Sequence, residues 1–203
     1  MTEADVPGVA ALYERHAHAW ARERAKSTFP ERAWLDRFLD AIPSGSAILD
    51  LGCGSGIPIA HYLLEHGFRV TGIDASRTMI DLAHERTPGG AWHVADMRTA
   101  DLASTFAGVL AWDSFFHLGP DDQRAMFAVF RKHAAEGTIL MFTSGPSPGE
   151  AIGSLEGEPL YHASLAGSEY RSLLETHGFE VLAHVAEDPE CAGRTVWLAR
   201  LRS

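Results

Sequence analysis

The stretch ILDLGCGSG at residues 48–56 decides the fold of this chain. An apolar run that carries one acid, Asp50, leads directly into three glycines at alternate positions, Gly52, Gly54 and Gly56. The apolar run indicates a buried strand, because short continuous apolar segments are typical of parallel sheets. Glycines after such a strand let the backbone approach a ligand closely and adopt angles that other residues avoid. The sequence therefore predicts a strand followed by a ligand-binding loop.

Outward from this loop, predicted strands and helices alternate along most of the chain. The predicted strands are residues 47–51, 68–73, 92–95, 108–112, 138–143, 179–185 and 195–201. The predicted helices are residues 9–26, 33–41, 58–66, 76–86, 120–135 and 168–177. Such alternation predicts an α/β fold, with a Rossmann-like seven-stranded, mostly parallel sheet and helices on both faces. The last two strands follow each other without a helix, so we expect the last strand to be antiparallel.

The composition argues against several classes of protein. With 203 residues, of which 46% are hydrophobic and 22% charged, the chain fits one soluble globular domain. It has no apolar run long enough to span a membrane, and its first residues, MTEADVPG, lack the apolar region of a signal peptide. The net charge of −10 and the lack of a Lys/Arg cluster disfavour nucleic-acid binding. Cys53 and Cys191 fit no disulfide framework, so we expect a cytoplasmic protein, and the histidines form no zinc motif, so we expect no metal.

Acids at the ends of three predicted strands indicate what the loop binds. Dinucleotide folds use G-x-G-x-x-G, but here Ile57 stands where the third glycine would fall, and Asp50 would repel a pyrophosphate. A carboxylate at Asp50 suits the cationic end of a ligand instead. Asp74 ends the second strand, where a carboxylate accepts both hydroxyls of a ribose. Asp96 ends the third strand and could accept from an exocyclic amine, with Met97 against the ring. The three acids favour a ligand with an ammonium or sulfonium end, a ribose and an adenine.

With these features the sequence resembles the class I S-adenosylmethionine-dependent methyltransferases, in particular the small bacterial members that act on small molecules. The resemblance rests on ILDLGCGSG at 48–56, GID at 72–74, VADM at 94–97 and VLAWDSFFHL at 109–118. It implies S-adenosylmethionine as the methyl donor and S-adenosylhomocysteine as the product. It also implies transfer to O, N or S of a small-molecule acceptor by a monomer or homodimer.

The resemblance further implies donor contacts in the loops that follow the first four strands. Together with the strand and helix residues that flank these loops, the contacts are Asp50, Gly52, Cys53, Gly54, Gly56, Asp74, Ala75, Met79, Asp96, Met97 and Trp112. Gly52 to Gly56 would line the methionine part, Asp74 would hold the ribose, and the residues after it would flank and close the adenine. Trp112 would lie beside the sulfonium.

The loop after the fourth strand carries the candidates for catalysis. His117 is the first candidate for a general base, because imidazole titrates near neutral pH. Its alternative is a packing role beneath the next helix with a bond to the backbone. Asp113 lies four residues earlier and is a second candidate for the proton acceptor, or else a substrate contact or a loop cap. Phe116 is expected at the wall of the acceptor pocket.

Two further segments are expected to cover the site of a single domain that spans residues 1–203. Residues 1–44 would form a helical lid in which Tyr13 and Trp20 cover the donor, or would simply pack on the domain. Residues 144–167 show no period, and we expect a loop without structure of its own that recognises the acceptor through Tyr161 and His162.

The remaining parts complete the domain and leave two other functions open. Residues 45–143 would form the donor-binding core, and residues 168–203 would add a helix and a hairpin. A nicotinamide-dependent oxidoreductase and a non-catalytic nucleoside-binding protein are the alternatives to a methyltransferase.

Overall fold

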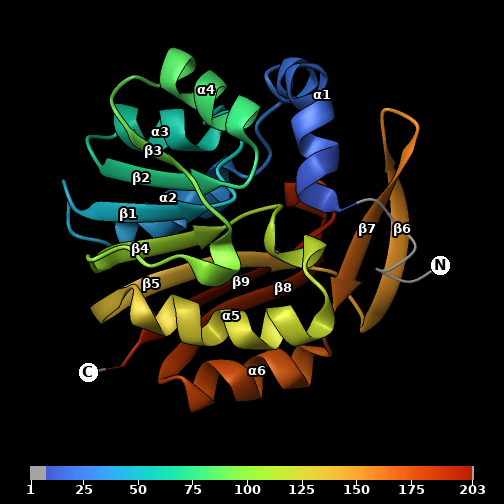
Figure 1. Cartoon of the computed structure of the whole chain (residues 1–203). Coiled ribbons are helices and arrows are strands. Elements are labelled where there is room, and N and C mark those ends of the chain that lie inside the picture. The colour runs from blue at the N-terminus through green and yellow to red at the C-terminus, as the bar shows by residue number, and fades with distance from the viewer. Residues whose placement is uncertain (1–7, 203) are drawn as a thin grey trace.

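A seven-stranded sheet forms the centre of the computed structural model, which describes residues 8–202 (Figure 1). The strand order is β3-β2-β1-β4-β5-β9-β8. These strands are β1 (Ala47–Leu51), β2 (Arg69–Asp74), β3 (Ala91–Val94), β4 (Phe106–Ala111), β5 (Ala134–Ser144), β8 (Phe179–Asp188) and β9 (Arg194–Leu201). The pairs from β3 to β5 are parallel, whereas β9 is antiparallel to both β5 and β8. The predicted sheet with an antiparallel last strand is therefore confirmed.

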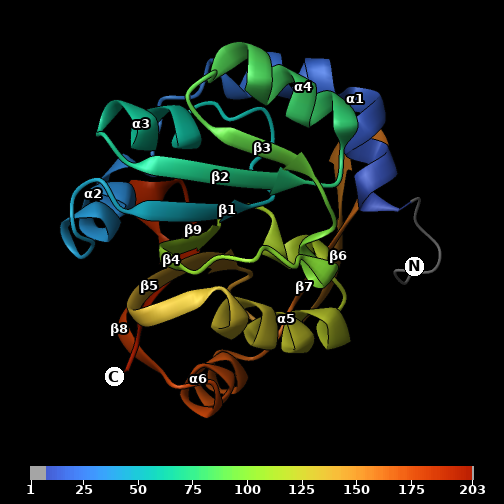
Figure 2. The ribbon, with the colours of Figure 1, turned by 60° about the vertical axis from the view of Figure 1, so that its left-hand side comes forward.

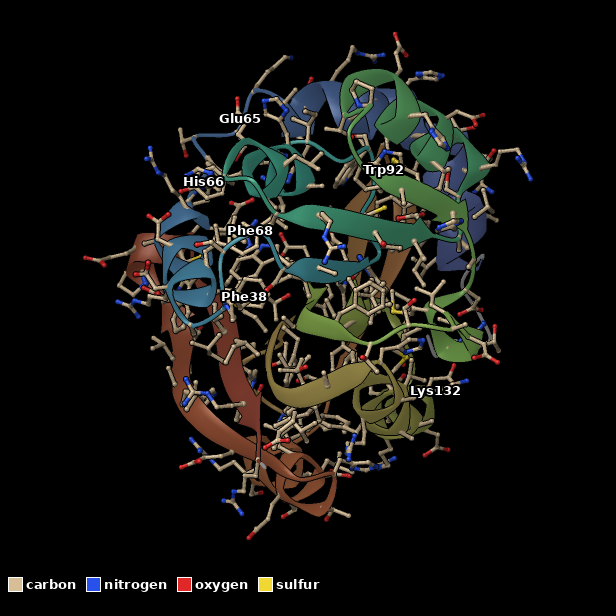
Figure 3. The ribbon with its side chains drawn as sticks, turned by 90° about the vertical axis from the view of Figure 1, so that its left-hand side faces the viewer. Phe38, Glu65, His66, Phe68, Trp92 and Lys132 are labelled. Carbon is tan, nitrogen blue, oxygen red and sulfur yellow. The ribbon has the colours of Figure 1, made fainter. Side chains whose placement is uncertain are left out.

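Helices cover both faces of the sheet, because alternate strand residues supply an apolar surface to each side (Figure 2). The helices are α1 (Val9–Arg24), α2 (Arg32–Asp40), α3 (Ile59–Glu65), α4 (Arg77–Arg86), α5 (Pro120–Lys132) and α6 (Gly167–Thr176). Ile48 packs with α2, α3 and α4, whereas its neighbour Leu49 packs with α5 and α6. Figure 3 shows Phe38 on α2 and Phe68 before β2, both of which belong to the first of these layers.

The expectation that residues 144–167 lack structure of their own is wrong. They contain a β-hairpin, formed by β6 (Gly149–Leu155) and β7 (Glu158–Ser164), which pair only with each other. Glu156 and Gly157 make its turn with positive φ angles of 51° and 83°, as a two-residue hairpin turn requires. The strand period is hard to see in the sequence because β6 is almost entirely exposed, so it has no regular apolar face.

Helix α1 stands between α4 and β7 and contacts both (Figure 1). Its apolar contact with α4 is a small cluster, Ala17 and Ala21 against Met79 and Leu82, separate from the two main layers of the core. Residues 1–7 of the expected lid, and Ser203, lie outside the described residues. No helix within residues 8–202 has the length and apolar character needed to cross a membrane.

Candidate active site

The glycine-rich loop turns sharply over the end of β2. The backbone N–H groups of Gly52 and Cys53 both donate to the carbonyl of Ile73, at 2.8 and 3.0 Å. Gly52 has a φ of 80°, and a Cβ at this position would lie 2.4 Å from the Cβ of Ser114. Only glycine fits there, so the loop can turn and leave space beside it.

This space is a cavity of about 440 Å³, here called the inner cavity. Twelve of the predicted donor contacts line it: Tyr13, Trp20, Asp50, Gly52, Cys53, Gly54, Asp74, Ala75, Met79, Asp96, Met97 and Trp112. The strand ends β1 to β4 and helix α1 thus bring together residues that are up to 99 positions apart in the sequence (from 13 to 112). Topology explains this convergence, because the carboxyl ends of parallel strands meet at one edge of the sheet.

Gly56 is the exception among the predicted donor contacts. It does not line the inner cavity but faces α4, where an added Cβ would lie 2.6 Å from Oγ1 of Thr87. Its φ of 76° and this close approach explain the glycine. The close approach to Thr87 thus accounts for a glycine at this position, and the donor contact of Gly56 stays a prediction.

The Asp74 carboxylate is held in place by the backbone on both oxygens. Its Oδ2 accepts from the N–H of Gly54 at 3.0 Å, and its Oδ1 accepts from the N–H of Ser76 at 2.9 Å. Burial raises the pKa of Asp74, while these two hydrogen bonds act in the opposite direction. The carboxylate is thus fixed at the edge of the cavity with lone pairs left for a ligand.

Asp50 is the most unusual acid of the inner cavity, because it is only 3% exposed. Burial, and then the neighbouring charge of Asp74, raise its pKa to about 7. A buried carboxylate of this kind is stabilised by a cationic ligand that shares its environment. The thiol of Cys53 also has its pKa raised by burial, so it stays neutral and acts here as a small side chain.

Two positively charged side chains at the inner cavity were missed by the sequence analysis. Arg98 lies next to Asp96 and bonds to both oxygens of its carboxylate, at 2.6 to 3.0 Å. Arg24, at the end of α1, is paired with the fully buried Glu31, and its side chain is 13% exposed. The signal for Arg24 is its spacing, since it follows the buried Ala17 and Ala21 by seven and three residues on the same helix face.

The Trp112 indole lies almost entirely buried beside the inner cavity. Within the described part of the chain its Nε1–H has no hydrogen-bond partner. A buried N–H without a partner is costly. The inner cavity therefore offers the carboxylates of Asp50, Asp74 and Asp96 and the guanidinium of Arg24, which fits a zwitterionic ligand with a nucleoside part.

His117, on the short helical turn η3 (Phe115–His117), has both ring nitrogens engaged. Its Nδ1 lies 2.9 Å from the carbonyl oxygen of Tyr161, so Nδ1 carries the proton and donates. Burial lowers the pKa of His117 to about 4, so the ring is neutral and Nε2 accepts from the hydroxyl of Tyr13 at 3.0 Å. Burial also raises the pKa of Tyr13 well above its usual value of 10. The result is a fixed Tyr13–His117 pair at the cavity wall.

A second cavity of about 750 Å³, here called the outer cavity, lies beyond this wall. Five residues line both cavities: Tyr13, Trp20, Arg24, Asp113 and His117. Phe116 and His162 line the outer cavity only, with their ring centroids 5.4 Å apart. The predicted acceptor contact Tyr161 lies elsewhere, 1% exposed and against the inner cavity.

Asp113 forms an ion pair across the outer cavity floor. Both of its oxygens accept from the guanidinium of Arg194 on β9, at 2.8 to 2.9 Å. Its backbone has a φ of 48°, and its N–H donates to Oγ1 of Thr143. The ion pair with Arg194 holds the loop after β4 against β9. It fits a role of Asp113 as a loop cap better than a role as a free proton acceptor. In residues 8–202 no three His, Cys, Asp or Glu side chains gather as metal ligands would.

Comparison with known proteins finds several methyltransferases among the matches. The family model described as "Methyltransferase domain" matches residues 48–137. A dTDP-3-amino-3,4,6-trideoxy-alpha-D-glucopyranose N,N-dimethyltransferase from Streptomyces venezuelae is 30% identical over 101 residues, which is 49% of this chain and 42% of that protein. A dTDP-4-amino-2,3,4,6-tetradeoxy-D-glucose N,N-dimethyltransferase from Saccharopolyspora spinosa is 24% identical over 155 residues, 75% of this chain and 59% of that protein. The chain thus spans about half the length of these curated relatives.

A solved structure matches over nearly the whole chain. It is that of CalS10 with bound S-adenosylmethionine, an amino pentose methyltransferase from Micromonospora echinaspora. The TM-score is 0.71 at 25% sequence identity, and the match covers 91% of this chain and 95% of the other. Because the match covers 91% of this chain, it extends to segments on both sides of residues 48–137.

Proposed function

We propose that this chain is a class I S-adenosylmethionine-dependent methyltransferase and that it methylates the nitrogen of a small-molecule amine. One observation carries the proposal: two cavities share a wall, and the inner one has the charges that S-adenosylmethionine needs. Asp50 would hold the ammonium group, Arg24 the carboxylate and Asp74 the ribose. The cytoplasmic location, the monomer or homodimer and the lack of a nucleic-acid partner remain expectations from the sequence.

S-Adenosylmethionine supplies an already activated methyl group. The protein therefore has to align an acceptor, exclude water and accommodate the positive charge that the acceptor gains. Tyr13, Trp20 and His117 form the wall where the two cavities meet, so the acceptor atom would lie against them. The aromatic rings of Tyr13 and Trp20 suit a developing ammonium ion, because their faces attract cations.

The Tyr13–His117 pair favours nitrogen over a weakly acidic hydroxyl as the acceptor atom. A neutral amine attacks without losing a proton first, whereas a hydroxyl needs a base. A histidine whose pKa is lowered to about 4 is a poor base at neutral pH, and its Nε2 already accepts from Tyr13. Because the Tyr13 proton points to His117, the phenolic oxygen can accept an N–H of the amine and orient its lone pair. The sequence alone suggests His117 as a base, but its proposed role here is to hold Tyr13 in place.

The proposed activity is tested by incubating the protein with S-adenosylmethionine labelled on the methyl group and a panel of amino sugars, aromatic amines and phenols. Transfer to one or more amines, with release of S-adenosylhomocysteine, is the expected result. Transfer to phenols alone would refute the choice of nitrogen. No transfer to any acceptor by a protein that binds the donor would favour the nucleoside-binding alternative.

Replacing Tyr13 by Phe should lower kcat about tenfold and leave the affinity for the donor nearly unchanged, because one orienting hydrogen bond is lost while the ring remains. Steady-state rates with an accepted amine between pH 6 and 9 measure this. Tyr62→Phe is the matched control, since the Tyr62 hydroxyl bonds to Asp36 away from both cavities. An unchanged kcat would remove Tyr13 from the mechanism, and a loss above 1,000-fold would point to obligatory base catalysis.

Replacing His162 by Ala should raise the KM for the acceptor about fivefold while the affinity for the donor stays the same. His162 lines the outer cavity only and packs between Phe116 and His117, with ring centroids 5.4 and 4.8 Å away. The exposed His18 on α1 gives the control variant, His18→Ala. A change in donor affinity without a change in the acceptor KM would contradict the assignment of the outer cavity.

A further inference from the structure

We propose that Glu14 is a positioning residue that fastens α1 over the donor through the first turn of α4, so that release of the donor product waits for α1 to open. This inference rests on the proposed function of the inner cavity. It concerns a residue that the donor itself does not touch, since Glu14 is not among the residues that line either cavity.

Glu14 makes three hydrogen bonds to the start of α4. Its Oε2 accepts from the Ser76 hydroxyl at 2.5 Å and from the backbone N–H of Thr78 at 3.0 Å. Its Oε1 accepts from the Thr78 hydroxyl at 2.8 Å. A carboxylate there also meets the positive end of the α4 dipole. A side chain of α1 therefore caps a different helix, which joins two elements that are 62 to 64 residues apart in sequence.

The same first turn of α4 holds the carboxylate assigned to the ribose. Ser76, which donates to Glu14, also gives its backbone N–H to Asp74 at 2.9 Å. Asp74 in turn accepts from the backbone N–H of Gly54 in the glycine-rich loop. Glu14 is exposed whereas Ser76 is only 1% exposed, so this chain of contacts runs from the surface to a buried site beside Asp74. The position of α1 and the position of the donor loop are thus tied together.

Helix α1 is held against α4 by both apolar and polar contacts. The fully buried α1 side chains in this contact are two alanines, Ala17 and Ala21, and the larger Tyr13 and Trp20 pack partly buried against the same cluster. At the same time α1 supplies Val9, Tyr13 and Trp20 to the wall of the inner cavity. Among the polar contacts of α1, those of Glu14 reach Ser76, which bonds to Asp74, so they lie on the donor side of the helix.

The residues that follow Glu14 tie α1 to the opposite wall. Arg15 and His16 both bond to Glu158 at the turn of the β6–β7 hairpin, each at 2.6 Å. These contacts reach the acceptor side, whereas Glu14 reaches the donor side. The two sets can therefore be separated by mutation, and only the loss of Glu14 should affect the donor product.

The test is the rate at which S-adenosylhomocysteine leaves the protein, followed by stopped-flow tryptophan fluorescence, because Trp20 and Trp112 line the cavity. Glu14→Ala should raise the dissociation rate roughly tenfold, since hydrogen bonds to a charged group are lost, and should leave the association rate unchanged. Glu23→Ala is the matched control, because Glu23 is an exposed glutamate of α1 that pairs only locally with Lys26. Its dissociation rate should equal that of the wild type.

Two further measurements distinguish control of product release by Glu14 from a role that only stabilises α4. Glu14→Ala should hardly change the unfolding temperature of the ligand-free protein, and bound S-adenosylhomocysteine should no longer protect the arginines of α1 from trypsin. Combining Glu14→Ala with Thr78→Ala should add nothing to the dissociation rate of Glu14→Ala alone. An unchanged dissociation rate, or equal protection of α1 in variant and wild type, would overturn the proposal for Glu14. Failure of the wild type to bind S-adenosylhomocysteine at all would instead overturn the proposed function.

Discussion

Asp74→Ala is expected to weaken the binding of S-adenosylmethionine by about 100-fold or more. The wild-type carboxylate is fixed by the N–H groups of Gly54 and Ser76, so its remaining lone pairs are oriented before the ligand arrives. Two charge-assisted hydrogen bonds to ribose hydroxyls, at about 1.5–3 kcal/mol each, account for a loss of this size. Calorimetric titration of the purified variant measures it.

Asp74→Asn and Asp101→Ala serve as the comparison variants for this loss. Asn keeps the shape and one acceptor oxygen, so its affinity should fall between that of the wild type and that of Asp74→Ala. Asp101 is an exposed acid whose side chain is 75% accessible, and its removal should have no effect on the donor. Donor affinity within threefold of the wild type in Asp74→Ala would show that the ligand does not use this carboxylate.

The affinity for S-adenosylmethionine should rise with pH up to about 7 and then level off. Asp50 has its pKa raised to about 7 in the empty site, so below that pH it must lose its proton before it can hold an ammonium group. Well below pH 7, each further unit of pH should therefore lower the affinity about tenfold. Titrations between pH 5.5 and 8 should show this slope in the wild type and a much flatter profile in Asp50→Asn. Equal slopes in the two proteins would exclude Asp50 as the titrating group.

The raised pKa of Asp50 makes the ligand-free protein less stable as the pH rises, whereas it makes donor binding stronger. The pKa of Asp50 is higher in the folded state than the usual 3.9 of an unfolded chain, so the folded state binds the proton more tightly. This contribution to stability is complete below pH 4 and is lost as the pH rises through about 7. A shift of about three pKa units corresponds to about 4 kcal/mol. Asp50→Asn should therefore be more stable than the wild type at pH 8, and the difference should be smaller at pH 5, as urea unfolding without ligand would show.

The sheet and most of the inner cavity followed from local patterns in the sequence. An apolar run such as Ile48 to Leu51 and a helix signal such as Ser76, whose hydroxyl accepts from Met79, are both encoded within a few residues. Once the strands are placed, topology alone brings Asp50, Asp74 and Asp96 to one edge of the sheet.

Features that depend on contacts across the chain were not visible in the sequence. The tautomer of His117 is set by Tyr161 and Tyr13, which are 44 and 104 residues away. Gly56 belongs to the same motif as Gly52 but faces Thr87 at the C-terminal cap of α4, and nothing in the spacing distinguishes the two. The β6–β7 hairpin was missed because its outer strand is exposed and shows no apolar period.

The most direct test of the central claim is calorimetric titration of the purified protein with S-adenosylmethionine, S-adenosylhomocysteine and NAD at pH 8. The account predicts that both sulfur nucleosides bind at one site and that NAD does not, because Asp50 opposes a pyrophosphate and favours a cation. Binding of NAD alone, or of none of the three, would contradict the assignment of the inner cavity and the methyl transfer that depends on it.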